Sequence, residues 1–589
     1  MPADFGMKVK KQEARKAGRA AAKTAVALEP ARKPWWPYIL GCLVALALAF
    51  EVYGPSLYGP FLFDDRYLPF SIPNFPVDSL RAWLAGVRPV LMFSYWVNCE
   101  LSGIENTFSF HALNVIFHAV NSVFVFFIAR KILKFAELEN RRRDIAALFA
   151  GALFLLHPVN SESVGYVASR SENLSVLFFF AAFTVFLYRR AAAVTWPRTV
   201  GILALFGAAV LTKEHTIALP ALLLLTDYFW NPPFSLSGMR RNWKLYAPIF
   251  AGGILAGAYL LHKVRHDISA GFAVTDFTWY QYFFTECRAF WLYIRLFLFP
   301  VKLRIDYDFP PSHTILDHGA ILGLAAILVA AAIAFYFRRR FPLAAYGFFA
   351  FVILMAPTSS FIPIKDPVAE RRLYLSMIGL LFLVLEWLRR VDLKQPRWMA
   401  ALAAVLLIAG VMTYQRNFVW SDALALWEDT AAKSPHKARD QFQLAQAYYE
   451  RGECAKAIPH YERTAQLDST DDRLFIDWGL ALDCLNQPDQ AVAKFLQAAK
   501  LKPTAHVYSQ IGMIYAKLGK NAEALDALAT AEKLNPDFDV TYDYRGRVYL
   551  NLGNPPAAVA EFRRALALNP RNQQASQGLA MAEARLQQH

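Results

Sequence analysis

The feature that most constrains this chain is a series of apolar runs between residues 37 and 414, most of them near the length of a membrane-crossing helix. A helix needs about 20 apolar residues to cross a hydrocarbon core of about 30 Å. With 56% hydrophobic and 19% charged residues among 589, a disordered chain or one soluble domain is excluded. We expect eleven spans, several of them short: 37–53, 111–130, 144–158, 172–188, 199–212, 216–230, 246–262, 315–337, 341–357, 372–388 and 397–414.

Clusters of Lys and Arg between the runs indicate the orientation of the chain, because these residues are enriched in cytoplasmic linkers. The clusters occupy alternate linkers, so we expect the N-terminus inside and everything after about residue 415 outside or in a lumen. The basic clusters are the N-terminal tail, 130–143, 189–198, 240–244, 338–340 and 389–397. The expected outer segments are 54–110, 157–172, 212–216, 263–314 and 357–371.

This arrangement accounts for the net charge of +15, so a nucleic-acid partner is not expected. The basic region before the first apolar run is longer than that of a signal peptide. We therefore interpret residues 1–35 as a retained cytoplasmic tail.

Residues 279–300 do not fit the alternation. They are apolar enough to span, but a twelfth span would put the basic cluster 338–340 on the outer face. They also contain Glu286, Arg288 and Arg295. We expect a helix that lies in the interface or enters the membrane only partway on the outer side.

The last third of the chain repeats with a period of about 34 residues. This is the period of tetratricopeptide (TPR) units, which are pairs of helices that stack into a solenoid. Such arrays hold peptides or proteins on a concave surface, and self-assembly is the alternative role. The recurring positions are the small residues Ala445, Gly479, Gly512 and Gly546 and the prolines Pro503, Pro536 and Pro570.

Two segments are expected to flank the repeats. Residues 421–435 look like a lone second helix, continuous with the last span, and 572–588 look like a polar capping helix. The five cysteines are scattered without a CxxC motif, so neither a disulfide framework nor a zinc ribbon is expected. Cys454 and Cys484 lie in adjacent units and could pair in an oxidising compartment, but free thiols are favoured.

Unusual polar residues collect in the expected outer segments. Ionisable groups at membrane depth are costly and are therefore candidates for function. The alternatives are capping of a loop helix by Asp64 and Asp65, interhelical hydrogen bonds, and snorkelling of single cations to the interface. His157 is interpreted as the end of a helix. The candidates are Asp64, Asp65, Arg88, His111, Asn114, His118, Glu162, Arg170, Glu172, Lys213, Glu214, His215, Asp306, Asp308, Glu370 and Arg371.

The pattern suits glycosyl transfer from a lipid-phosphate sugar. A carboxylate at the membrane surface can take a proton from an acceptor hydroxyl. Nearby cations can stabilise a lipid phosphate as the leaving group. No Walker A, Rossmann, HExxH or GxSxG motif supports a nucleotide, zinc or serine-hydrolase site.

Seven motifs follow one another along the chain in an order that resembles a known family. They are FLFDD (61–65), RPVLMFSYWVN (88–98), SFHALNVIFHAVNS (109–122), LLHPVNSESVGYVASRSENL (155–174), LTKEHTIALPALLLLTDY (211–228), PVAERRLYLSMIGL (367–380) and WEDTAAKSP (427–435). From about residue 55 to 580 the chain resembles the transmembrane and TPR-containing O-mannosyltransferases, in the C-type glycosyltransferase superfamily, as a bacterial member.

The resemblance implies an all-α fold: an eleven-span core at 36–418 with a first outer loop at 54–110, followed by a TPR solenoid at 419–589. It implies an inverting, metal-independent transfer of a mannose-like hexose from a polyprenyl-phosphate donor to Ser or Thr of a protein held by the array. No other cofactor is expected. The implied location is a bacterial inner membrane with the array in the periplasm.

The resemblance also assigns residues. Asp64 and Asp65 fall on the family's acidic pair, with Asp64 as the base and Asp65 orienting the acceptor or the loop. Arg371, Lys213, Arg170 and Arg88 are expected to bind the donor phosphate, although Ser169 and Ser171 depart from the family's pattern beside Arg170. The expected supporting residues are Glu214, Glu370, His118, Asn114, Glu162 and Asp306.

Two alternatives stay open: a glycosyltransferase that modifies lipid or envelope glycan, and a degenerate membrane scaffold whose array assembles an envelope or secretion complex. A transporter is a weaker third alternative, because the repeated half-helices typical of transporters are not evident in the sequence. The sugar, the acceptor and the oligomeric state are left open.

Overall fold

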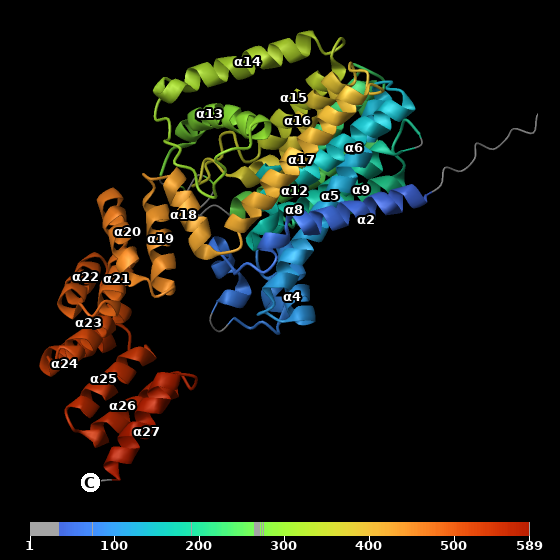
Figure 1. The fold of residues 1–589 in the computed structure, drawn as a ribbon. Helices are drawn as coiled ribbons and strands as arrows, with labels where there is room; N and C mark the ends of the chain where they lie inside the picture. Colours follow the sequence, from blue (N-terminus) through green and yellow to red (C-terminus); the bar gives the residue numbers. More distant parts are fainter. Residues whose placement is uncertain are drawn as a thin grey trace, which may run out of the picture.

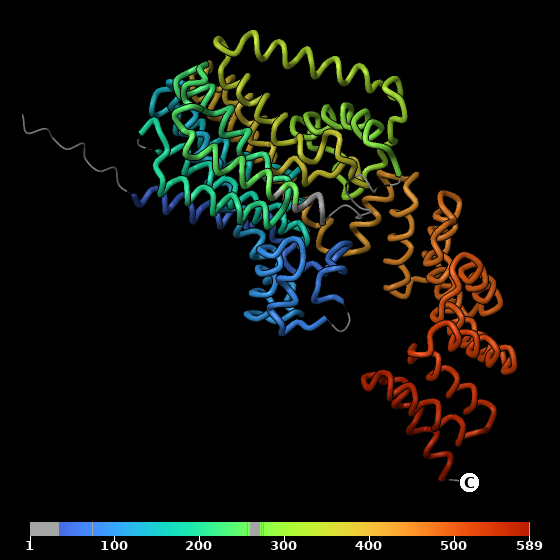
Figure 2. The backbone as a smooth tube through the Cα atoms, turned by 180° about the vertical axis from the view of Figure 1, so that it is seen from behind, coloured from blue at the N-terminus to red at the C-terminus, as the bar shows by residue number. Residues whose placement is uncertain are grey.

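The computed structural model describes residues 35–72, 75–189, 191–263, 271, 274 and 276–587. The predicted basic tail lies outside these residues, apart from Trp35. Every regular element in the described part of the chain is a helix. Figure 1 shows two parts, a bundle of long helices and an arm of short paired helices that leads away from it. The view from behind shows the same arrangement (Figure 2).

Each of the eleven ranges expected to span a membrane is occupied by a helix. These helices are α2 (Trp36–Val52), α5 (Thr107–Phe135), α6 (Asn140–Leu156), α8 (Arg170–Leu187), α9 (Trp196–Val210), α10 (Leu219–Trp230), α12 (Trp243–Lys263), α14 (Ala320–Tyr336), α15 (Pro342–Met355), α16 (Leu373–Leu388) and α17 (Pro396–Val419). Several begin with a proline in the first turn, where the missing N–H has no partner to lose.

Fewer helices are long and apolar enough to cross a membrane alone. Within the residues that the structure describes, four qualify: Thr107–Phe135, Val167–Leu187, Asp317–Tyr336 and Pro396–Val419. A fifth would be the pair Asn140–Leu156 and Pro158–Gly165, which is bent by 47°. The count of eleven spans therefore stays a prediction.

Close backbone contact holds the middle of the bundle together. A Cβ added to Gly347 of α15 would lie 2.5 Å from the carbonyl oxygen of Gly379 in α16. Small residues allow this approach, which is typical of helix pairs in membranes. Around them, α5 packs against α2, α6 and α8.

The outer helices expose apolar side chains instead of burying them. Only 6% of the apolar window of α14 and 17% of that of α17 is buried within the protein. In α2, Leu40 and Leu43 are 52% and 58% exposed. Apolar surface of this extent needs a covering, and lipid supplies one. These helices indicate that the chain is a membrane protein.

Residues 279–300 form α13 (Trp279–Leu298), an amphipathic helix that packs against α14 and α16. Its buried face includes Glu286, which lies 3.3 Å from Arg372. The helix is not among the candidate spans in the described residues. Its predicted position at the interface stays a prediction.

Short helices fill the loops of the bundle. They are η1 (Gly54–Ser56), η2 (Phe63–Tyr67), η3 (Pro69–Ser71), α3 (Leu80–Leu84), α4 (Pro89–Ser102), η4 (Pro158–Asn160), α7 (Ser161–Gly165), η5 (Val167–Ser169), η6 (Glu214–Ala218), α11 (Ser237–Arg241), η7 (Asp317–Gly319) and η8 (Glu370–Arg372). The first loop, which carries α4, projects from the bundle on the side from which the arm leaves (Figure 1).

The arm consists of antiparallel helix pairs with the predicted period. Its helices are α18 (Ala423–Lys433), α19 (Ala438–Glu450), α20 (Cys454–Leu467), α21 (Asp472–Cys484), α22 (Pro488–Leu501), α23 (Ala505–Lys517), α24 (Asn521–Leu534), α25 (Asp539–Asn551), α26 (Pro555–Leu568) and α27 (Gln573–Leu586). A Cβ at Gly479 would lie 2.8 Å from the ring of Phe495, so the repeated glycines allow the paired helices to touch.

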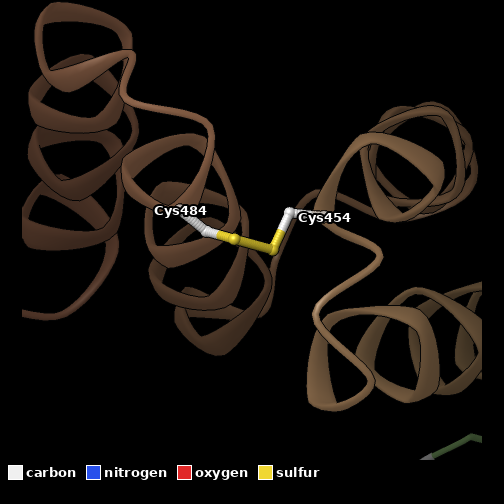
Figure 3. Close-up of a disulfide and its surroundings, with 2 residues drawn as sticks. All are labelled: Cys454 and Cys484. Carbon is white, nitrogen blue, oxygen red and sulfur yellow. A yellow bond between two sulfur atoms is a disulfide. The ribbon is translucent and has the colours of Figure 1, made fainter.

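The structure corrects two predictions for this region. Helix α18 is not continuous with α17, because the chain turns at Trp420 and Asp422 caps a new helix by accepting from the backbone N–H of Ala425. Cys454 and Cys484 form a disulfide instead of remaining free thiols (Figure 3). Cys454 begins α20 and Cys484 ends α21, and antiparallel packing of the two helices brings these ends together.

Candidate active site

Loops that are far apart in the sequence meet at the predicted site. Helix η2 contacts η5, η8 contacts both η4 and α7, and η6 contacts the beginning of α8. The apolar helices position these loops, because each loop joins two packed helices. They bring together most of the charged residues predicted from the sequence.

The two aspartates of the acidic pair have different surroundings. The Asp64 side chain is exposed, and its backbone N–H donates to the hydroxyl of Tyr166 at 2.6 Å. Asp65 is 1% exposed, and its carboxylate accepts from the backbone N–H groups of Leu62 at 3.0 Å and Ala168 at 2.6 Å. Burial raises the pKa of Asp65 to about 8, although these two donors act in the opposite direction. Asp65 thus ties η2 to η5 and leaves Asp64 free.

Arg371 lies beside this pair and is held by Glu162. Its guanidinium donates to one oxygen of Glu162 at 2.5 Å, and its backbone N–H donates to the other at 3.0 Å. Burial acts to lower the pKa of Arg371, but Glu162 and then Asp64 raise it above its usual value. The ion-pair partner of Arg371 is thus Glu162, which lies 209 positions away in the sequence.

Two further cations are also paired with carboxylates. Lys213 lies 2.5 Å from Glu172, and Arg88 makes two hydrogen bonds of 2.8 Å to Glu214. Burial lowers the pKa of Lys213, Glu172 opposes this, and the charges of Arg88 and Arg371 lower it further. Lys213 is therefore close enough to both Arg88 and Arg371 for their charges to affect its pKa. Their side chains stay partly accessible, at 38% for Arg88, 15% for Lys213 and 23% for Arg371.

Arg170 does not fit the predicted contact with a phosphate. Its guanidinium is 0% exposed and donates to Asn114, Asn98 and two backbone carbonyl oxygens. It also lies 4.4 Å from the centre of the Tyr95 ring. Because it is enclosed and its donors are used, Arg170 joins α4, α5 and α8 instead of facing a ligand.

Asn114 and His118 of α5 also make internal contacts. Asn114 donates to the carbonyl oxygen of Tyr166 at 3.2 Å, next to the loop that holds Asp65. His118 lies 2.8 Å from the Tyr374 hydroxyl and 3.0 Å from the Leu155 carbonyl oxygen. They support the site by packing the helices below it.

Glu370 and Asp306 belong to the junction with the arm. Glu370 is 1% exposed and accepts from the Arg304 backbone N–H at 2.6 Å and from the Tyr307 hydroxyl at 2.7 Å. Burial raises the pKa of Glu370 to about 7. Asp306 pairs with Lys437 and Arg439 at the beginning of α19.

Sequence reasoning missed three participants: Tyr166, which holds Asp64; Glu172 as the partner of Lys213; and Arg439. No sequence signal could have revealed them as partners, because each contact joins segments that are distant in the chain.

Comparison with known proteins gives a consistent result. Residues 414–472, 505–538 and 540–572 match tetratricopeptide repeat families. The protein O-mannosyl-transferase TMTC3 of Mus musculus is 24% identical over 546 residues, covering 82% of this chain and 57% of that protein. TMTC1 of Homo sapiens is 26% identical over 484 residues, covering 70% of this chain and 54% of that protein.

This chain therefore spans less than two thirds of the length of these relatives. Among solved structures, the TPR protein YrrB aligns with 30% of this chain and 88% of its own, at 21% identity and a TM-score of 0.24. The chain is an all-helical protein with C-terminal tetratricopeptide repeats that resembles the transmembrane and TPR-containing O-mannosyltransferases over about four fifths of its length.

Proposed function

We propose that this protein is an integral-membrane glycosyltransferase that moves a mannose-like hexose from a polyprenyl-phosphate donor to Ser or Thr hydroxyls of an acceptor protein. The observation that carries the proposal is the exposed carboxylate of Asp64 near Arg371, whose charge also acts on Lys213, at loops that join apolar helices. A lipid-linked phosphate needs an apolar wall for its tail and cations for its head group, and this arrangement supplies both.

Asp64 is the general base in this proposal. Its carboxylate takes the proton of the acceptor hydroxyl while the hydroxyl oxygen attacks the anomeric carbon of the sugar. The bond from that carbon to the phosphate oxygen breaks, and the polyprenyl phosphate leaves with the electron pair. Attack from the face opposite the phosphate inverts the anomeric configuration.

Arg371, Lys213 and Arg88 hold the donor phosphate and stabilise the charge of the leaving group. Glu162, Glu172 and Glu214 fix these cations in place before the donor arrives. Asp65 contributes by fixing the loop on which Asp64 stands.

The proposal includes an eleven-span core at 36–418 with the N-terminal tail inside and the first loop, 54–110, outside. The alternation of basic clusters supports this orientation. The array, at 419–589, would lie on the outer face, which is the periplasm if the protein is from a bacterium. The disulfide between Cys454 and Cys484 supports an oxidising compartment for the array.

The array supports a protein acceptor, because a lipid acceptor needs no solenoid. Its first unit lies next to the acidic pair: Arg66, which follows Asp65, makes two hydrogen bonds of 3.0 Å to Glu450 at the end of α19. An extended acceptor held along the array would begin its path beside Asp64.

The test is transfer by the purified full-length protein in lipid vesicles. The vesicles contain labelled polyprenyl-phosphate mannose, and a Ser- and Thr-containing peptide is added. We expect labelling of the peptide, and Asp64→Asn lowers the rate by roughly 10²–10⁴-fold because it removes the base but keeps the shape. The matched control is Asp78→Asn, an exposed aspartate of the same loop, which leaves the rate unchanged.

Wild-type transfer by the Asp64→Asn variant would contradict the assignment of the base. Label in lipid instead of peptide would favour an enzyme that modifies lipid or glycan. No transfer by the wild-type protein would favour a scaffold.

A further inference from the structure

A cluster of charged residues joins the arm to the core, and none of its members has a role in the proposed transfer step. We call it the junction cluster, and it consists of Asp306, Asp366, Lys437, Arg439 and Asp440. Arg439 donates to Asp306 at 2.6 Å and to Asp366 at 2.8 Å. Lys437 also pairs with Asp306 and lies 3.8 Å from Asp366. Asp440, which is 0% exposed, follows Arg439 in α19.

The two aspartates that Arg439 joins come from different loops of the core. Asp306 stands in the loop after α13, and Asp366 stands in the segment that leads to Arg371. The same two segments are tied a second time, because the backbone N–H of Arg304 donates to Glu370 at 2.6 Å. The loop after α13 is thus a bridge between the arm and the segment that carries Arg371.

Side chains of the arm also form hydrogen bonds with the backbone of this loop. Lys433 at the end of α18 donates to the carbonyl oxygen of Leu303 at 2.8 Å. The hydroxyl of Ser434 donates to the carbonyl oxygen of Asp306 at 2.9 Å and accepts from the backbone N–H of Asp308 at 3.2 Å. Figure 1 shows α18 and α19 lying between the bundle and the rest of the arm.

Arg439 also contacts Phe63, the residue that precedes the acidic pair. Its guanidinium lies 5.3 Å from the centre of the Phe63 ring, within the range of a cation–π contact. Trp427 of α18 packs edge-on against the same ring at 5.7 Å. Phe63 immediately precedes Asp64 and has a positive φ of 47°, which a residue with a Cβ adopts only when its surroundings hold it there.

One side chain of the arm therefore contacts both halves of the proposed site: the residue before Asp64 and the segment before Arg371. We propose that Arg439 is a positioning residue for glycosyl transfer, so that the first repeat unit completes the active site and is more than a tether for the acceptor. This inference rests on the proposed function. In this role Arg439 takes no part in bond making or breaking. It keeps the distance between Asp64 and Arg371 at the value that transfer requires.

The test compares Arg439→Gln, Asp306→Asn and the charge-exchanged pair Arg439→Asp with Asp306→Arg, all in the full-length protein. Misplacement of reacting groups by about 1 Å lowers a rate by roughly 100-fold. We expect each single variant to lower kcat by roughly 10- to 100-fold with the KM for the acceptor unchanged, and the exchanged pair to recover part of the loss. The control is Arg563→Gln, an exposed arginine of α26 whose partner Glu583 also lies in the arm.

Hydrogen exchange supplies a readout that does not need transfer. We expect the amides of 61–67 and 366–372 to exchange faster in Arg439→Gln, with α5 and α23 unchanged. If the proposed function fails, transfer is absent but this exchange result remains. Normal kcat with normal exchange in these two segments would overturn the inference, and so would a loss confined to acceptor KM, which would make the first unit a tether.

Discussion

In the core, the contacts that matter join residues far apart in the sequence. His118 of α5 meets Tyr374 of α16, and Arg371 meets Glu162. In the arm, each helix packs on its neighbours in the sequence, as Gly479 does against Phe495. The free energy of unfolding of such a solenoid is close to a sum of contributions from single repeats and from the interfaces between neighbouring repeats. The stability of a core held by long-range pairs cannot be divided among segments in this way. A substitution in the core should therefore affect segments far away in the sequence, whereas a substitution in the arm should affect only the neighbouring helices.

The largest effect is expected from Arg371→Ala, which breaks a long-range pair. The change leaves the carboxylate of Glu162 buried without its cation, and removing one partner of a buried pair costs about 3–5 kcal/mol. It also removes a ligand for the donor phosphate. We expect a lower thermal midpoint in detergent. We also expect the transfer rate to fall by roughly 10²–10³-fold, since losing one group that stabilises a developing charge has an effect of this size.

The double change of Arg371→Ala with Glu162→Ala separates the two effects. It should recover much of the thermal midpoint, because no buried charge is left unpaired, but none of the transfer. Recovery of transfer would show that Arg371 acts on folding alone.

Removing the disulfide of the arm should have a smaller and more local effect. It joins residues separated by 30 positions, and closing a loop of this length contributes about 3–4 kcal/mol in the chain-entropy treatment. We expect Cys454→Ser with Cys484→Ser to speed hydrogen exchange in α20 and α21 but not in α5 or α16. Faster exchange throughout the core would contradict local stabilisation of the arm.

Gly479→Val tests the close approach of helices within one unit. The added Cβ would meet the Phe495 ring at 2.8 Å, and overpacking of this kind costs about 1–3 kcal/mol. Limited proteolysis should cut α21 and α22 sooner and leave the core intact. Gly41→Ala in α2 is the control, because nothing lies within 4 Å of its added Cβ. Equal protection of both variants would mean that the repeated glycine is not needed for packing.

The smallest effect on stability is expected from Arg88→Gln. Arg88 and Glu214 are 38% and 33% exposed, and ion pairs of this exposure contribute about 0–1 kcal/mol. We expect the thermal midpoint to change little while the KM for the lipid donor rises, because a phosphate-binding charge is lost. A midpoint as low as that of Arg371→Ala would place Arg88 among the structural pairs.

The same comparison explains what the sequence could predict. The helix pairs of the arm, including the capping helix, were predicted from the sequence. This was possible because repeat units that are adjacent in the sequence also pack against each other. The core helices followed from the apolar runs, since each run must form its own backbone hydrogen bonds. The side-chain partners of Arg371 and Lys213 were not predictable, because Glu162 and Glu172 are identified only when the loops are brought together.

Two errors have the same origin. Arg170 looked like a phosphate ligand because it is a cation near membrane depth, but Asn98, Asn114 and carbonyl oxygens from other helices enclose it. Cys454 and Cys484 were placed in adjacent units where they could pair, but free thiols were favoured, and the packing of α20 on α21 instead brings them into a disulfide. In both cases, the deciding contact came from another segment of the chain.

The central claim is that Asp64 serves glycosyl transfer to protein, and mass spectrometry of cellular proteins tests it most directly. Cells that make this protein are compared with cells from which its gene is deleted and cells that make Asp64→Asn, matched for protein level. We predict hexose on Ser and Thr of exported or membrane proteins in the first cells, and its loss at the same sites in the other two. The same modified sites in all three would contradict the account.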